Sequence, residues 1–225
     1  MHESSKEANN QYLLEIGLEE MPAGMILPAV EQLKKAAEKS LESNRLQSAK
    51  VQPFSSPRRL ALLISELPEK QEDRIEELKG PPASIARDQD GAWSKATLGF
   101  AKKNGIEPDS LEVRNFDGRD YLYTAKNVQG ASLKDILKQE APEWIKGLNF
   151  PKNMRWGHYK MRFARPIRWL VSLWNKEVLH FSLEMVEAGK HTLGHRFLSP
   201  KPSELLSAQD YHSHLHYLFV EVDFN

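Results

Sequence analysis

Apolar and polar residues alternate near the start of the chain, and this pattern predicts the first strand. Every second residue of 12–19, beginning with Tyr12, is apolar, while Glu15 and Gly17 fall on the opposite side. Alternation with a period of two is typical of a strand with one buried face. Residues 59–67 are apolar almost without a break, which predicts a second strand that is more deeply buried.

Two segments have the period of an amphipathic helix. In residues 25–43 apolar side chains recur at spacings of three and four, with Pro28 near the start, where a helix tolerates proline. Residues 94–106 predict a shorter helix that begins with Ser94 as its N-cap. An Asn-Gly pair stands where this second helix should end, as is typical of helix C-termini.

Two hairpins follow from turn residues between β-rich runs. Residues 111–128 contain two such runs around an Asp-Gly pair, whose tolerance of positive φ suits a tight turn. The runs 166–174 and 177–185 predict a second hairpin. In the first of these two runs, Ile167 and Trp169 are expected on one face.

The remaining segments give weaker patterns. Residues 68–82 form a charged connection with some helical character, which the Gly-Pro-Pro at its end should stop. Ser132 resembles the first residue of a capping box and predicts a helix that Pro142 interrupts. The C-terminal part predicts a helix followed by a strand at 219–224. Together these elements favour an α+β fold with a mixed, largely antiparallel sheet and flanking helices.

Composition narrows the class of protein. The chain has 225 residues, with 31 basic and 31 acidic side chains and no cysteine, which excludes disulfides, thiolate nucleophiles and cysteine-based zinc sites. No run reaches the ~18 apolar residues that a membrane span needs. We therefore expect a cytoplasmic protein with no membrane association. Residues 1–11 are polar and predict a disordered leader, with one α+β domain over 12–225.

One segment departs from the neutral balance of the chain. Between Glu143 and Glu177 there are eight basic residues and no acid, interleaved with aromatic side chains. Basic and aromatic side chains together suit RNA phosphates and bases, although a solvated hairpin face with tryptophans in the core gives the same composition. The absence of acids favours RNA binding. The candidate RNA-binding residues in this segment are Lys152, Arg155, Lys160, Arg162, Arg165 and Arg168.

Histidines and acids elsewhere offer fewer chemical possibilities. His195 and Arg196 lie in a glycine-rich loop, where they suit phosphate better than metal, and a structural turn is the alternative. The three alternating histidines of 212–216 are expected on the surface of a helix. Glu19 and Glu20 suit paired acid–base work or the dipole of the following helix.

Arginines near the second strand are expected to be structural. Arg58 and Arg59 precede an apolar run, and a buried ion pair with Glu19 or Glu20 is favoured over a basic surface. Trp169 is expected in the core. No phosphate loop, dinucleotide fingerprint, nucleophile elbow or zinc-binding helix is present, so the residues favour a binding module and identify no catalytic group or metal site.

Several separated motifs resemble one known family. They are "LLEIGLEEMPAGMILPAVEQL", "SSPRRLALLISEL", "KGPP", "MRWGHYKMRFARPIRWLVSLW" and "GHRFLSPKP". In this order they are similar to the N-terminal region of the bacterial glycyl-tRNA synthetase β subunit, from about Tyr12 to Phe224. Leu18 and Met21 depart from the family pattern, where Thr and Leu are expected.

The resemblance implies a biochemical role that the spacing of residues in this sequence does not show by itself. It implies an α2β2 ligase for ATP, glycine and tRNA(Gly), in which the α subunit holds the active site and uses ATP and Mg²⁺. This chain would then be an N-terminal part of a longer β subunit, without a cofactor of its own. Its domain would resemble the B3/B4 region of phenylalanyl-tRNA synthetase.

Three hypotheses follow from the residues and the resemblance. In the first, the basic segment with His195 and Arg196 positions tRNA(Gly) by phosphate contacts. In the second, the same arginines and tryptophans are structural or form an interface between subunits. The third is an editing-like hydrolase with Glu19, Glu20 and His195 as acid–base groups, which rests on fold analogy.

Overall fold

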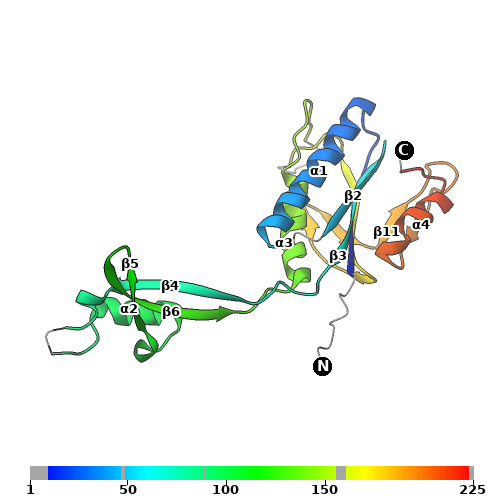
Figure 1. The fold of residues 1–225 in the computed structure, drawn as a ribbon. Coiled ribbons are helices and arrows are strands. Elements are labelled where there is room, and N and C mark those ends of the chain that lie inside the picture. The colour runs from blue at the N-terminus through cyan, green and yellow to red at the C-terminus, as the bar shows by residue number, and fades with distance from the viewer. Residues whose placement is uncertain (1–9, 47–48, 89, 156–160, 223–225) are drawn as a thin grey trace, which may run out of the picture. The chain divides into compact units, whose positions relative to one another are not determined.

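The computed structural model describes residues 10–46, 49–88, 90–155 and 161–222. The chain forms two compact units (Figure 1). The larger unit comprises Met1–Gln71 and Ala131–Asn225, and the smaller unit comprises Glu72–Gly130. The prediction of one domain over 12–225 did not distinguish the inserted smaller unit.

A seven-stranded sheet forms the centre of the larger unit within the described residues. Its strand order is β2-β3-β1-β7-β10-β9, and β8 pairs with β7. All these pairings are antiparallel except that of β10 with β7. The strands are β1 (Asn10–Leu18), β2 (Lys50–Ser56), β3 (Arg59–Leu67), β7 (Ile167–Trp174), β8 (Glu177–Val178), β9 (Ser182–Leu183) and β10 (Val186–Gly189).

Two helices cover one face of this sheet. Helices α1 (Ala23–Ser43) and α3 (Leu133–Lys146) lie on the same side of it (Figure 1). The apolar stripe of α1, which includes Leu33 and Ala37, is buried against alternate residues of β1 such as Leu14 and Ile16. The alternation of β1 and the helical period of α1 therefore meet in one apolar core.

The second face of the sheet is covered by the C-terminal part of the chain. Helix α4 (Tyr211–Tyr217) and the hairpin of β11 (His191–Leu193) and β12 (Pro202–Glu204) lie on this side (Figure 1). Leu13 of β1 packs here with Trp169 of β7 and Leu215 of α4. Consequently β1 is buried on both faces, and the prediction that it is half-buried is wrong.

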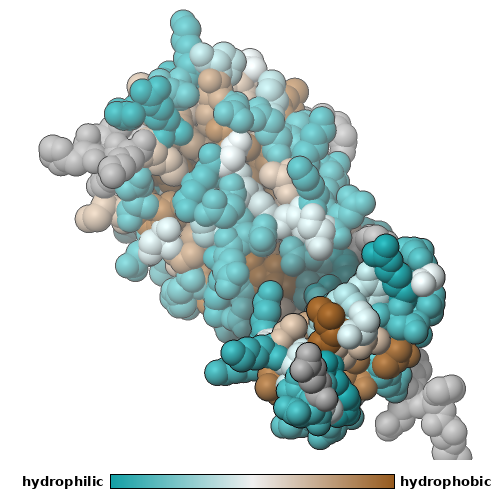
Figure 2. All heavy atoms as spheres, turned by 90° about the vertical axis from the view of Figure 1, so that its left-hand side faces the viewer, coloured by the Kyte–Doolittle hydropathy of each residue, from teal (hydrophilic) through white to brown (hydrophobic). Residues whose placement is uncertain are grey.

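The smaller unit has a three-stranded antiparallel sheet. It contains β4 (Arg74–Pro82), β5 (Glu112–Phe116), β6 (Arg119–Val128) and helix α2 (Lys95–Asn104), and its strand order is β4-β6-β5. Short 3-10 helices occupy Ala83–Ile85 and Pro108–Ser110, and a third lies at Ala208–Asp210 in the larger unit. Exposed apolar side chains are interspersed with hydrophilic ones on the surface of the smaller unit (Figure 2).

Most elements predicted from local patterns are confirmed, as is the α+β class. Helix α2 has Ser94 as its N-cap, with the Ser94 hydroxyl accepting from the Thr97 N–H, and it ends at Gly105 with positive φ. The hairpin of β5 and β6 turns at Asp117 and Gly118, both at positive φ. Ser132 is the N-cap of α3, but its side chain makes no capping hydrogen bond.

Other local predictions are wrong. Residues 74–82 are strand β4 rather than a partly helical connection, because they pair with β6. The segment 177–185 forms two short strands, β8 and β9, and not one. Residues 219–222 are not a strand, and 223–224 lie outside the described residues. Asn10 and Gln11 belong to β1 rather than to a disordered leader.

The face of Ile167 was also predicted wrongly. The register between β1 and β7 shifts at Gly17 and Leu18. Ile167 therefore joins the core under α1 and α3, whereas Trp169 joins the core under α4. A one-residue irregularity is enough to exchange faces, because side chains alternate along a strand.

The apolar face of α1 predicts a contrast between two leucines of the same helix. Leu33→Ala should lower the free energy of unfolding by about 2–5 kcal/mol, because Leu33 is fully buried and leaves a cavity. Leu27 is 58% exposed, so Leu27→Ala should change it by less than about 0.5 kcal/mol. Urea unfolding of both variants checks this, and equal losses would contradict the described packing of α1.

Candidate functional site

A charged cleft lies at one end of the central sheet of the larger unit. Its volume is about 570 Å³, within the ~300–1,000 Å³ of typical ligand sites. Four arginines and two glutamates supply the charge, so positive charge is in excess by two. The lining residues are Glu19, Glu20, Arg58, Arg165, Arg168, Leu193 and Arg196.

Backbone hydrogen bonds bring distant segments together at the cleft. Glu19 and Glu20 follow the end of β1, and Arg58 lies in the turn between β2 and β3. The Leu18 N–H donates to the Arg58 carbonyl at 2.8 Å, and the Glu19 N–H donates to the Pro166 carbonyl at 3.2 Å. These bonds fix the entry to β7 beside the end of β1.

The arginines of the cleft differ in how they are paired. Arg168 Nη1 lies 3.7 Å from Glu19 Oε1, with both side chains more than half exposed, so this pair contributes little to stability. Arg165 Nε donates to the Glu20 carbonyl at 3.0 Å. Burial, together with the nearby positive charges of Arg59 and Arg196, lowers the pKa of Arg58, although Glu20 opposes this.

A buried ion pair lies beneath the cleft. Glu15 of β1 and Arg59 of β3 are 0% and 1% exposed, and Arg59 Nη1 lies 3.5 Å from Glu15 Oε2. Charges removed from water are stable only when additional hydrogen bonds satisfy them. The remaining hydrogen-bond partners of Glu15 and Arg59 are therefore needed to keep both charges buried.

Neighbouring strands supply those hydrogen bonds. Glu15 Oε1 accepts from the Trp169 indole N–H and, at 2.7 Å, from the Thr192 hydroxyl. Arg59 donates to the Thr192 hydroxyl at 3.2 Å and to the Leu193 carbonyl. The ion pair thereby connects β1, β3, β7 and β11, and it holds Leu193 at the wall of the cleft.

The indole ring of Trp169 depends on a glycine beside it. Gly17 stands opposite Trp169 in the register of β1 and β7. A Cβ atom at Gly17 would lie 1.9 Å from the Trp169 ring, so only glycine leaves room for it. The guanidinium groups of Arg58 and Arg59 lie 5.8 and 5.7 Å from the ring centroid, at the distance of cation–π contacts.

Tyr211 of α4 lies in the same buried environment. Burial raises its pKa well above the ordinary value, and the nearby charge of Glu15 raises it further. The Tyr211 hydroxyl and Arg59 Nε have no hydrogen-bond partner among the described residues. Tyr211 therefore stays neutral across the physiological range and contributes mainly its ring, which packs at 5.7 Å against Phe54.

The loop after β11 brings Arg196 to the cleft. A Cβ atom at Gly194 would lie 2.9 Å from the Leu218 carbonyl oxygen, so the loop requires glycine there. The His195 N–H donates to that same carbonyl at 2.9 Å. His195 Nδ1 accepts weakly from the N–H groups of Phe197 and Leu198 at 3.3 Å, and His195 does not line the cleft.

The structure groups some of the predicted residues and separates others. Arg165, Arg168 and Arg196 share the cleft with Glu19 and Glu20. The remaining described candidates, Lys152, Arg155 and Arg162, are exposed and do not line it. Lys160 lies outside the described residues. Glu19, Glu20 and His195 are not united in one pocket.

Of the residues expected to be structural, two are buried and the other three line the cleft. Arg59 and Trp169 are buried, but the partner of Arg59 is Glu15 rather than Glu19 or Glu20. Helix α1 has no side-chain cap, so the two glutamates do not cap it. Arg58 was expected to be structural, and it is half-buried and lines the cleft.

Sequence reasoning missed Glu15 and Thr192. Glu15 was placed on a solvent face by the alternation of β1, and Thr192 gave no signal of its own. The one available signal was a charged residue inside the otherwise apolar alternation of β1. A charge in such a position has to find a partner when the second face is covered.

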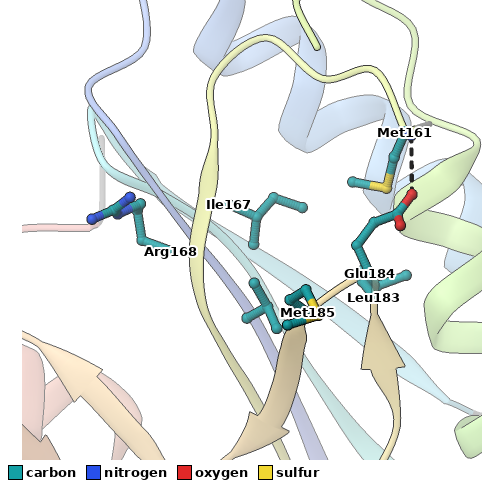
Figure 3. Close-up of a pocket in the computed structure, with 7 residues that line it drawn as sticks. Met161, Ile167, Arg168, Leu183, Glu184 and Met185 are labelled. Carbon is teal, nitrogen blue, oxygen red and sulfur yellow. Dashed lines mark hydrogen bonds between the residues drawn. The ribbon is translucent and has the colours of Figure 1, made fainter. Parts of the chain in front are cut away.

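A second pocket, of about 270 Å³, lies next to the cleft and shares Arg168 with it. Met161, Ile167, Leu183 and Met185 line it, and Arg168 points away from these side chains (Figure 3). The Met161 N–H donates to Glu184 Oε1 at 3.0 Å, shown as the dashed line in Figure 3. Arg168 thus borders both an apolar and a charged surface.

No group of three or more histidine and acidic side chains in the described part of the chain lies close enough to share a metal ion. None of the described helices combines the length and the apolar composition that crossing a membrane requires.

Nearly the whole length of this chain matches known proteins of one family. Residues 12–225 match the family model described as "Glycyl-tRNA synthetase beta subunit". The glycine–tRNA ligase beta subunit of Limosilactobacillus reuteri is 43% identical over 95% of this chain and 31% of its own length. That of Shouchella clausii is 43% identical over 84% and 27%. The chain therefore spans about a third of the length of the relatives that it matches.

The close approach of Gly17 to Trp169 predicts a contrast between two glycines. Gly17→Ala should lower the free energy of unfolding by about 2 kcal/mol or more, because its Cβ displaces the indole ring. Gly24→Ala should be neutral or stabilising by up to ~1 kcal/mol, since nothing lies within 4 Å of its Cβ. Thermal and urea unfolding measure both.

A Trp169→Leu background supplies the control for this mechanism. If the ring is the obstacle, Gly17→Ala should cost clearly less in that background, because the two residues are coupled. An undiminished cost would show that the sensitivity of Gly17 has another origin.

Proposed function

The chain belongs to the glycyl-tRNA synthetase beta-subunit family, and from this membership we propose that it serves a glycine–tRNA ligase by binding and positioning tRNA(Gly). The observation that carries the proposal is the arginine-lined cleft. Guanidinium groups form strong, charge-assisted hydrogen bonds with phosphate oxygens. Such contacts orient an RNA without reading its sequence.

Exposed basic residues near the cleft in sequence extend the proposed surface. Lys152, Arg155 and Arg162 are exposed, and no ion pair is found for them in the described ranges 10–46, 49–88, 90–155 and 161–222. An exposed basic side chain without an acidic partner is available to neutralise a phosphate. The proposed tRNA surface comprises these three residues with Arg165, Arg168 and Arg196.

The catalytic partner is part of the proposal. We place glycine activation, with its ATP and Mg²⁺, in a separate α subunit of an α2β2 enzyme in the cytoplasm. The support is family membership together with a cleft lined by arginines and glutamates, which suits the binding of phosphate. In this arrangement the present chain contributes tRNA positioning and subunit contacts rather than bond making.

A structural role is favoured for two of the aromatic and basic residues. Arg59 and Trp169 are buried and hydrogen-bonded to Glu15, Thr192 and Leu193. They cannot reach a tRNA phosphate from these positions, so they act by holding the cleft. Arg58, which is half-buried, joins the surface proposed for tRNA.

The proposal predicts how tRNA binding responds to salt. In the assembled enzyme, Arg162→Ala and Arg165→Ala should each weaken tRNA(Gly) binding. Each should also flatten the log–log salt dependence by roughly 0.7–0.9 per lost phosphate contact, because fewer counterions are released. Filter binding at several salt concentrations measures both quantities.

Arg119→Ala provides the matched control for these variants. Arg119 is exposed on β6 in the smaller unit and is not part of the proposed surface. If Arg162→Ala and Arg165→Ala behave like Arg119→Ala, with unchanged affinity and slope, the assignment of the tRNA surface is wrong.

A further inference from the structure

The four arginines of the cleft differ in whether their guanidinium groups are paired. Arg168 is paired with Glu19, and Arg165 is bonded to backbone carbonyls. Within the part of the chain that the structure describes, the guanidinium groups of Arg58 and Arg196 make no ion pair or hydrogen bond. Both line the same cleft, which makes them a ready pair of donors for an anion.

Both arginines are carried by backbone that is fixed before any ligand binds. The Arg58 carbonyl accepts from the Leu18 N–H, and the Arg58 side chain is held beside the Trp169 ring. Arg196 follows Gly194 and His195, which are packed on and bonded to Leu218. Because the backbone is held in advance, binding costs less ordering entropy.

The acids of the cleft restrict the kind of anion that fits. Glu19 is engaged by Arg168, whereas no ion pair or hydrogen bond of the Glu20 carboxylate is found within the described residues. A carboxylate repels a second anion, but it accepts a hydrogen bond from a hydroxyl group. The cleft thus favours a ligand that carries a phosphate and a neighbouring hydroxyl.

We propose that the cleft binds one ribose-phosphate unit, with its phosphate between Arg58 and Arg196 and a ribose hydroxyl donating to Glu20. This deepens the tRNA-positioning proposal, on which it rests, by naming the unit recognised. A cleft of about 570 Å³ has the size of sites that take small ligands. The 2′-hydroxyl is the group that distinguishes RNA from DNA, so the cleft should prefer RNA.

Binding of short oligonucleotides to the 225-residue chain tests the proposal. A labelled oligoriboadenylate and its deoxy counterpart are titrated by fluorescence anisotropy at fixed salt. We expect tighter binding of the RNA. Arg58→Gln and Arg196→Gln should each weaken RNA binding by about tenfold or more, as loss of a charge-assisted hydrogen bond implies. Arg119→Gln, which removes an exposed charge from the smaller unit, should leave binding unchanged.

The Glu20→Gln variant tests the hydroxyl contact separately. Removing its negative charge should raise DNA affinity more than RNA affinity, so the RNA-to-DNA ratio falls. Competition by AMP identifies the source of the unit: displacement at low AMP concentration indicates a free nucleotide, and its absence indicates an RNA strand. Arg196 is exposed, so its variant remains informative even if Arg58→Gln disturbs the packing against Trp169.

Two results would overturn the proposal. One is equal binding of RNA and DNA that Glu20→Gln does not alter. The other is an RNA affinity that is the same for Arg58→Gln, Arg196→Gln and the control Arg119→Gln, whether or not the chain binds RNA. Measuring tRNA(Gly) affinity of the assembled enzyme in parallel separates the two proposals, since retained tRNA binding with an inert cleft defeats only this one.

Discussion

The buried ion pair between Glu15 and Arg59 is the interaction on which the larger unit depends. Both side chains are almost completely removed from water, where an unpaired charge would be costly. Trp169, Thr192 and the Leu193 carbonyl supply further hydrogen bonds to the pair. One polar cluster therefore fixes four strands relative to each other inside an otherwise apolar layer. Fewer arrangements satisfy the hydrogen bonds of a polar cluster than satisfy the packing of an apolar one.

The same cluster also positions the residues that line the cleft proposed to bind tRNA. Trp169 lies across Gly17 and beside Arg58, so the ring that satisfies Glu15 also positions an arginine of the cleft. Arg59 holds Leu193, and the chain then passes through Gly194 to Arg196. The charged cleft is thus built on a buried network, which holds the segments that carry Arg58 and Arg196.

Local patterns predicted most elements, but not the contacts that complete the site. The periods of 12–19 and 25–43 and the cap at Ser94 are properties of neighbouring residues, so the sequence alone reveals them. Strand β4 was missed because its apolar residues, Ile75 and Leu78, have helical spacing, and pairing with β6 decides its structure. The burial of Glu15 was missed because Thr192 and Tyr211, which cover it, are far away in sequence.

A double-mutant cycle between Glu15→Gln and Arg59→Met measures whether the larger unit depends on this ion pair. Each single change leaves one buried charge without its partner and should lower the free energy of unfolding by about 3–5 kcal/mol. The double variant leaves no unpaired charge, so its loss should be clearly smaller than the sum of the two single losses. Additive losses in urea unfolding would contradict this dependence, because they would mean that the two residues stabilise the fold independently.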